Sequence, residues 1–281
     1  MNTTLIMNAS EGRIQFVLEQ EGSLACAQEW SAPSKGTELL TPALADAFQR
    51  LGIMPSDISR IACVAGPGSF TGLRLALAAA AALPLPLPCG RGPAPAAAFR
   101  RATGAAVAPL NALQVLAASV PFGLLFPARE TRIRVITHAR RGLVHGQDFL
   151  CAPGSALPSP VDEPVMWEIP AACGGERPDI MLGSGIARNL PQLQELFGDS
   201  APLFLPALTH PTAQALLDQT LSLPDGAWGH KDLDPLYLRP CDAVDNLASI
   251  AAKRGQTPEE AYAQLDKLLL PSAEEVVRGS R

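Results

Sequence analysis

The first third of the chain has the hydrophobic pattern of three strands followed by a helix. Apolar residues at Thr4–Met7, Arg13–Leu18 and Ser23–Trp30 form short extended runs separated by turn residues. Thr37 then opens a segment that ends at Gly52 and whose apolar residues recur at spacings of three and four. These apolar residues are Leu40, Leu44, Ala47, Phe48 and Leu51. The pattern predicts an amphipathic helix with one face against the core or against a partner.

A buried strand at Ile58–Val64 runs into a glycine-rich loop and then into an alanine-rich helical stretch. The loop reads Gly66-Pro67-Gly68-Ser69-Phe70-Thr71-Gly72-Leu73-Arg74. Glycine permits positive φ and close backbone approach, and free N–H groups at a helix start can hold an anion. Two interpretations stay open: a tight connection that needs glycine for packing, or a binding loop. The candidate binding residues are Gly66, Gly68, Ser69, Thr71, Gly72 and Arg74.

The second half repeats the order of strands followed by helices. A hairpin is predicted at Arg132–Thr137 and Leu143–Leu150, and two further strands at Val165–Ile169 and Ile180–Leu182, the last ending in Gly183-Ser184-Gly185. Helices follow at Asn189–Phe197 and Pro211–Leu221. This pattern predicts an α/β protein with two related lobes.

Two segments fall outside that pattern. Leu83–Ala98 is almost entirely Pro, Ala, Leu, Gly and Arg without a helix or strand period, which predicts an inserted loop. In the tail, Thr257 has the place of an N-cap, Pro258 the first helical position and Glu260 the third position after the cap. We therefore expect a first lobe at 1–128, containing the insert, a second lobe at 129–242 and a helical tail at 243–281.

Charge and cysteine usage limit the classes of function. The 22 Lys and Arg against 27 Asp and Glu give a net charge of −5, the opposite of the basic footprint of a protein that grips nucleic acid alone. The six cysteines form no C-x-x-C pair, so neither a zinc ribbon nor a disulfide framework is indicated. With no signal-peptide pattern and no long apolar span, we expect a cytoplasmic protein without a membrane segment.

The glycine-rich loop resembles the signature of the TsaB family almost letter for letter. Weaker matches follow in the same order along the chain: Thr37-Glu38-Leu39-Leu40-Thr41-Pro42, Ala139-Arg140-Arg141 with Val144, Gly183-Ser184-Gly185, and Pro235-Leu236-Tyr237-Leu238-Arg239, which resembles the closing strand of the family. Together they span roughly residues 4–240.

The resemblance implies an actin-like (ribonuclease H-like) α/β fold with two lobes and mixed sheets flanked by helices. It also implies a non-catalytic scaffold that dimerises with TsaD, the subunit that transfers threonylcarbamoyl to the adenosine beside the tRNA anticodon. An ATPase, TsaE, would act on the pair. Contact with tRNA would be indirect, and homodimers would form without the partner. The implied partner interface consists of Leu40, Leu44 and Phe48 on the first helix and Leu73 and Leu77 on the second. No cofactor, metal or catalytic residue is expected in this chain, although the partner interface could hold ATP or ADP.

Four departures from the family pattern bear on function. Asn8-Ala9-Ser10 stands where the family has an aspartate, threonine, serine turn, so the carboxylate that active members of the wider fold use for metal and nucleotide is absent. Gly36 and His138 also replace the usual histidine and aspartate. The insert at 83–98 interrupts what the family has as one helix.

Other functions remain alternatives. An ATP-dependent enzyme of the actin-like and sugar-kinase class would need a carboxylate at Asn8. A peptidase-like hydrolase is disfavoured because neither H-E-x-x-H nor G-x-S-x-G is present. His138 and His145 could face each other across the hairpin and bind a metal, or be structural. The arginine-rich segment Arg129–His145 could be a solvated strand face or touch RNA.

Overall fold

The chain separates into two compact units, residues 1–238 and residues 239–281. The computed structural model describes residues 3–31, 35–82, 105–121, 128–230, 233–238, 247–253 and 255–269. The insert expected at 83–98 therefore lies outside the described residues.

The first sheet contains the three strands expected at the start of the chain. Its order is β3 (Ser23–Ser31), β2 (Arg13–Gln20), β1 (Thr3–Asn8), β4 (Ile58–Gly66) and β5 (Ala106–Asn111). The pairs β1–β2 and β2–β3 are antiparallel, whereas β4 runs parallel to both β1 and β5. This mixed sheet carries the glycine-rich loop at the end of a central strand.

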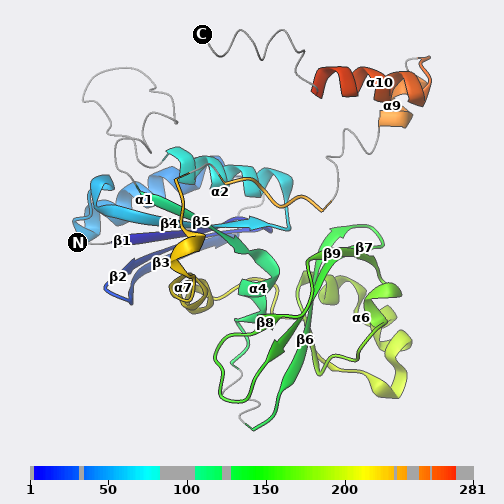
Figure 1. Cartoon of the computed structure of the whole chain (residues 1–281), viewed down its shortest axis with the longest axis horizontal. Coiled ribbons are helices and arrows are strands. Elements are labelled where there is room, and N and C mark those ends of the chain that lie inside the picture. The colour runs from blue at the N-terminus through cyan, green and yellow to red at the C-terminus, as the bar shows by residue number, and fades with distance from the viewer. Residues whose placement is uncertain are drawn as a thin grey trace. The chain divides into compact units, whose positions relative to one another are not determined.

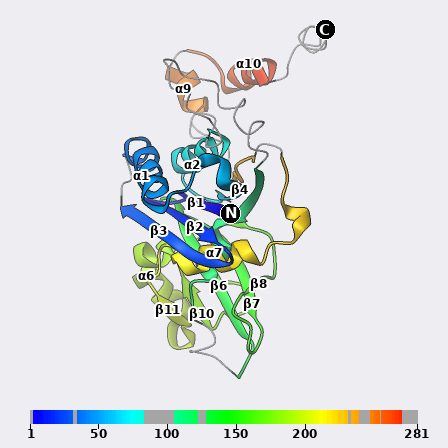
Figure 2. The same cartoon turned by 90° about the vertical axis from the view of Figure 1, so that its left-hand side faces the viewer.

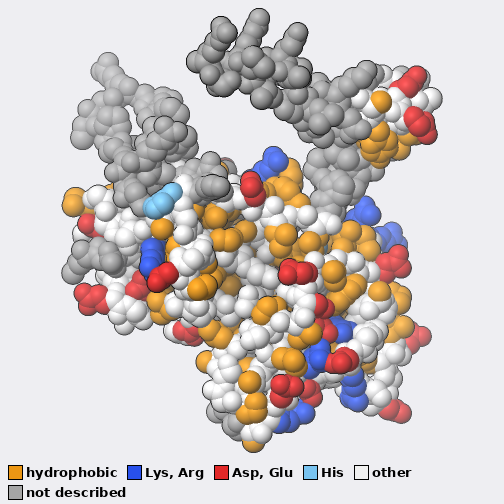
Figure 3. All heavy atoms as spheres, in the orientation of Figure 1, with side chains coloured by type: hydrophobic (Ala, Val, Ile, Leu, Met, Phe, Trp, Pro, Cys, Tyr) orange, Lys and Arg blue, Asp and Glu red, His pale blue; other side chains and the backbone are white. Residues whose placement is uncertain are grey.

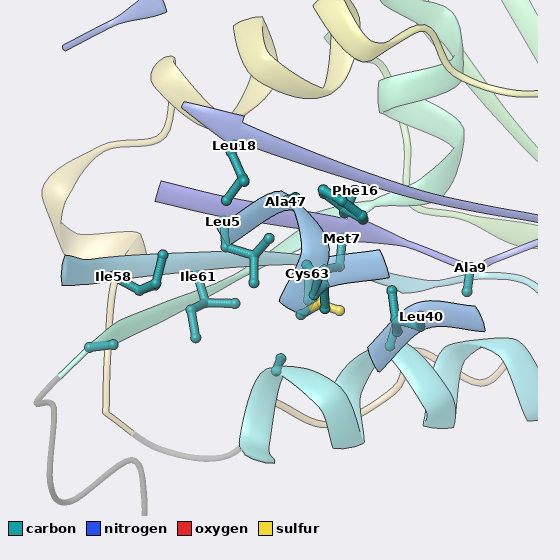
Figure 4. Packing of buried hydrophobic residues seen from close by; sticks show 14 of the residues in the cluster. Leu5, Met7, Ala9, Phe16, Leu18, Leu40, Ala47, Ile58, Ile61 and Cys63 are labelled. Carbon is teal, nitrogen blue, oxygen red and sulfur yellow. The ribbon is translucent and has the colours of Figure 1, made fainter. Parts of the chain in front are cut away.

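Helices cover both faces of the first sheet (Figures 1 and 2). On one face lie α1 (Gly36–Leu51) and α2 (Phe70–Ala82), and on the other lies α7 (Ala213–Leu221). Figure 4 shows the core on the first face, where β1, β2 and β4 contribute the side chains of Leu5, Met7, Phe16, Leu18, Ile61 and Cys63 and α1 contributes Leu40 and Ala47. Helix α1 ends as predicted, because Gly52 takes the left-handed conformation at φ 65°.

The second sheet is built on the predicted hairpin, β6 (Thr131–Arg140) and β7 (Leu143–Cys151). Its order is β11 (Leu203–Leu205), β10 (Ile180–Leu182), β6, β7 and β8 (Ser159–Pro160), and β9 (Val165–Glu168) also pairs with β7. Helix α6 (Ser184–Phe197) packs on one face and the short α4 (Ala112–Ala117) on the other. Short 3-10 helices lie at Pro55–Asp57, Ala171–Cys173, Gly198–Ser200 and Asp225–Ala227.

After the second sheet the chain returns to the first. Helix α7 packs on β1, β2 and β3, and Gly229 pairs with Val107 of β5. Farther on, Leu236 N–H donates to the carbonyl of Ala65 at 2.7 Å. The expected second lobe, 129–242, thus includes residues that pack on the first sheet. Residues 233–238, which contain the described part of the segment that resembles a closing strand, form no strand, and we call them the strap.

The second unit consists of α9 (Leu247–Lys253) and α10 (Pro258–Leu269) among its described residues. The capping box predicted for α10 is confirmed, because Thr257 Oγ1 accepts from Glu260 N–H at 3.3 Å and Glu260 accepts from Thr257 N–H at 3.0 Å. None of the described helices is long and apolar enough to cross a membrane.

The α/β fold class predicted from the sequence is confirmed, with two mixed sheets flanked by helices. Strand β5 and helix α4 were not predicted. Helix α6 also begins at Ser184, five residues before the predicted start, so the expected glycine turn is the first turn of a helix.

Candidate functional site

The glycine-rich loop packs directly against the backbone of the turn that follows β1. Ser69 N–H donates to the carbonyl of Ser10 at 2.7 Å. A Cβ added at Gly68 would collide with the carbonyl oxygen of Ser10, and one at Gly72 with that of Ala9. The loop therefore needs glycine because another stretch of main chain occupies the space beside it.

Gly66 has a similar role at the end of β4. Its φ is 129°, and a Cβ there would lie 2.7 Å from the carbonyl oxygen of Leu236 in the strap. At the start of α2, the hydroxyl of Ser69 accepts from Gly72 N–H at 3.3 Å. Of the two interpretations of the loop, this geometry supports tight packing over phosphate binding.

Asn8 is committed to hydrogen bonds within the chain. Its amide donates to Gln15 Oε1 at 2.7 Å, its Oδ1 accepts from Ser10 N–H at 3.0 Å, and only 2% of the residue is exposed. Gln15 in turn donates to the carbonyl of Pro211 at 2.7 Å. The position at which active members of the fold carry a carboxylate thus holds an internally paired amide.

The five residues expected at a partner interface are all buried within this chain. They are Leu40, Leu44, Phe48, Leu73 and Leu77, with exposures from 0% to 9%. The apolar stripe of each helix faces the sheet, so the assignment of these side chains to a partner surface needs correction. A partner that approaches α1 and α2 would meet their outward face, which consists of Glu38, Thr41, Pro42, Ala45, Asp46, Gln49, Arg50 and Leu51 on α1 and Phe70, Thr71, Arg74 and Ala78 on α2.

An aromatic and cationic cluster lies at the start of this outward face. The ring of Phe70 stacks on Tyr237 of the strap with a centroid distance of 5.1 Å and an interplanar angle of 24°. The guanidinium carbon of Arg74 lies 3.9 Å from the centre of the Phe70 ring, and Arg74 Nε donates to Tyr237 Oη at 3.0 Å. We call Phe70, Arg74 and Tyr237 the Arg74 cluster.

A partly buried carboxyl joins the turn after β1 to the start of α6. Ser184, the first residue of α6, donates its hydroxyl hydrogen to Glu11 Oε1 at 2.6 Å and accepts from His138 N–H at 2.9 Å. Burial raises the pKa of Glu11 from 4.5 to about 7, against the smaller opposing effects of the Ser184 hydrogen bond and of Arg188. Burial and Arg188 also lower the pKa of His138.

Three arginines of the segment Arg129–His145 form ion pairs within the protein. Arg134 is 3% exposed and donates to both carboxylate oxygens of Asp148, at 2.6 and 2.7 Å. Arg132 pairs with Asp148 and Glu176, and Arg129 with Asp179. On the face shown in Figure 3, basic side chains of this lobe lie beside acidic ones. These contacts favour the interpretation as a strand face over RNA contact through Arg132 and Arg134.

The two hairpin histidines do not face each other. The register pairs His145 with Thr137 and His138 with Val144, so the imidazoles of His138 and His145 point to opposite faces of the sheet. Their expected juxtaposition is wrong. Among the described residues, no group of three or more His, Cys, Asp or Glu side chains could hold a metal ion.

Comparison with known proteins finds similarity at two levels. A family model described as "TsaD: tRNA N6-adenosine threonylcarbamoyltransferase" matches residues 32–88, the segment that contains α1, β4, the glycine-rich loop and α2. No curated protein matches the sequence.

Two solved structures from Pseudomonas aeruginosa are similar to the chain. One is described as YeaZ, with 19% identity and a TM-score of 0.65. The other is described as an uncharacterized protein with similarity to peptidase YeaZ, with 20% identity and a TM-score of 0.66. Each match covers 85% of this chain and 100% of the other. YeaZ is a TsaB protein, so the TsaB resemblance is confirmed at the level of the fold.

Proposed function

We propose that this chain is a non-catalytic, TsaB-type subunit that binds TsaD and thereby supports threonylcarbamoyl modification of tRNA. The observation that carries the proposal is the fold, which the chain shares with YeaZ over 85% of its length. The TsaD family match at residues 32–88 supports the same pathway, because it falls on the unit of helix, strand, glycine loop and helix. The expected contacts with TsaE, and with tRNA through the complex, belong to this proposal.

The turn after β1 and the glycine-rich loop support a scaffold more than an enzyme. In an ATP-dependent relative, we would expect a carboxylate after β1 and an open phosphate loop. Here Asn8 is buried in an amide network, and the backbone of Ala9 and Ser10 fills the space beside Gly68 and Gly72. Nothing in this arrangement requires a bound nucleotide, and an ATP or ADP at the partner interface stays a prediction.

The outward face of α1 and α2 is the surface that we assign to TsaD. Helix α1 presents the small side chain of Ala45 at the middle of this face, and α2 presents Ala78. Small residues allow two helices to approach closely, as packing between helix pairs requires. The exposed Leu51, at 40% exposure, lies at the end of the same face.

The proposal is tested by co-expression with TsaD from the same genome, followed by size-exclusion chromatography with light scattering. We expect a one-to-one complex, and we expect Ala45→Glu to weaken it because a charged side chain would enter the helix contact. Ala187→Glu is the matched control, an exposed alanine on α6 of the other lobe. Separate elution of the wild-type chain and TsaD would overturn the proposal, and the mass of the chain alone reports the expected homodimer.

A further inference from the structure

The Arg74 cluster combines two segments that are far apart in the sequence. Phe70 and Arg74 are one turn apart on α2, whereas Tyr237 comes from the strap at 233–238, which Leu236 fixes to β4 through Ala65. Phe70 and Tyr237, which contact the guanidinium, are 38% and 37% exposed, and Leu236, the residue before Tyr237 in the strap, is 39% exposed. Contiguous exposed apolar groups of this kind mark interaction sites.

The guanidinium of Arg74 is held in place before any ligand arrives. The ring of Phe70 supports its flat face, and the hydroxyl of Tyr237 accepts from its Nε. An exposed arginine ordinarily loses rotamer freedom when it binds, and an arginine that is already fixed loses less.

The support of Arg74 differs from that of six other arginines in the described part of the chain. Arg13, Arg50, Arg60, Arg129, Arg132 and Arg134 each lie within ion-pair distance of a carboxylate. The described contacts of Arg74 are instead with an aromatic ring and a phenol, so its positive charge is not neutralised within this part of the chain. Its Nη1 and Nη2 atoms have no hydrogen-bond acceptor among the described residues. Two such N–H groups match the two oxygens of a carboxylate.

We propose that the Arg74 cluster binds an acidic side chain of TsaD, whose neighbouring apolar side chains cover Phe70, Leu236 and Tyr237. This inference rests on the proposed function and names the chemistry of the contact. Arg74 lies on the same outward stripe of α2 as Thr71 and Ala78, so the cluster is continuous with the helix face assigned to the partner. An inorganic anion would satisfy the guanidinium but would leave the three apolar side chains exposed. Buried tyrosine and arginine side chains carry much of the energy of protein interfaces.

The test measures the dissociation constant of the purified chain with TsaD by calorimetry. Arg74→Glu should weaken binding by about 30-fold or more, because the charge is reversed against the partner carboxylate. Arg74→Lys keeps the positive charge but loses the paired N–H groups of the guanidinium, so it should weaken binding less than Arg74→Glu does. Tyr237→Phe keeps the stack and removes the acceptor of Nε, and should cost about threefold to tenfold. Arg177→Glu, an exposed arginine of the other lobe, is the matched control and should leave binding unchanged.

The outcomes separate this inference from the proposed function. If the wild-type chain binds TsaD and the Arg74 and Tyr237 variants bind equally well, the Arg74 cluster is not part of the interface, while the scaffold function stands. If the wild-type chain fails to bind, both are overturned. Circular dichroism and the melting temperature of each variant check the fold. Arg74 is exposed on the surface of α2, so both should match the wild type.

Discussion

Replacing Glu11 by glutamine should remove a pH dependence that this carboxyl gives to the stability of the chain. Glu11 lies in the turn after β1, where its carboxyl is partly buried against the start of α6, and burial raises its pKa from 4.5 to about 7. Glutamine has nearly the same shape and keeps an oxygen that can accept from the Ser184 hydroxyl, which now lies 2.6 Å from Glu11 Oε1. The substitution therefore removes the ionisation and preserves the contact.

The magnitude follows from the two pKa values. The difference between 4.5 and about 7 corresponds to about 3 kcal/mol, at roughly 1.4 kcal/mol per pH unit. Because the folded state holds this proton more tightly than the unfolded state does, the contribution is fully present below pH 4.5. It is lost as the pH rises to about 7. The wild-type free energy of unfolding should therefore fall by about 3 kcal/mol relative to that of Glu11→Gln across this window.

Urea denaturation at pH 5, 6, 7 and 8 measures this difference for both proteins. Glu195→Gln, an exposed carboxyl on α6, is the control and should run parallel to the wild type. Groups that act on Glu11, including Arg188, and nearby His138 are the same in the wild type and in Glu11→Gln, so their effects largely cancel. Parallel curves for the wild type and Glu11→Gln would refute the reasoning, because they would mean that the carboxyl titrates alike in the folded and unfolded chain.

Two further substitutions each test packing within one of the two lobes. Gly72→Ala should destabilise the chain by about 2 kcal/mol in urea denaturation, because the added Cβ meets the carbonyl oxygen of Ala9. Gly226→Ala has open space around its Cβ and should change stability little, so an equal loss in both variants would contradict the packing explanation. Asp148→Asn should cost about 3 to 5 kcal/mol, because it leaves the buried guanidinium of Arg134 without a counter-ion. A loss below about 1 kcal/mol would mean that the backbone carbonyls around Arg134 suffice to hold its charge.

Local patterns in the sequence located many of the elements. Short extended runs separated by turn residues predicted β1 to β3, apolar spacings of three and four predicted α1, and Gly52 marked the end of α1. The capping residues at the start of α10 gave a helix boundary to the residue. These features depend on residues that are close in the sequence, which is why the sequence alone was sufficient for them.

Strand β5 was missed because Pro109 interrupts its apolar run. Pro109 is exposed on an edge strand, where proline is tolerated because the strand lacks a neighbour on one side for most of its length. Only the assembled sheet, with β4 on one side and a single bridge to Gly229 on the other, reveals this position.

The spacing of the apolar residues in α1 could not show which neighbour they pack against. Leu40, Leu44 and Phe48 repeat at helical spacing whether they meet the sheet of their own chain or the helix of a partner. The Arg74 cluster and the bond from Glu11 to Ser184 join residues more than 150 positions apart, and no local pattern links them. For the same reason, the glycines of the loop predicted a close approach of another backbone segment, but the sequence did not show that this segment is the turn after β1.

The central claim, that this chain supports threonylcarbamoyl modification of tRNA, is tested most directly by the modified nucleoside itself. We would deplete the chain in its own cells and quantify threonylcarbamoyladenosine in hydrolysed tRNA by mass spectrometry. The account predicts that the nucleoside falls on depletion, returns with the wild-type chain, and returns less fully with Arg74→Glu. An unchanged level after complete depletion would contradict it.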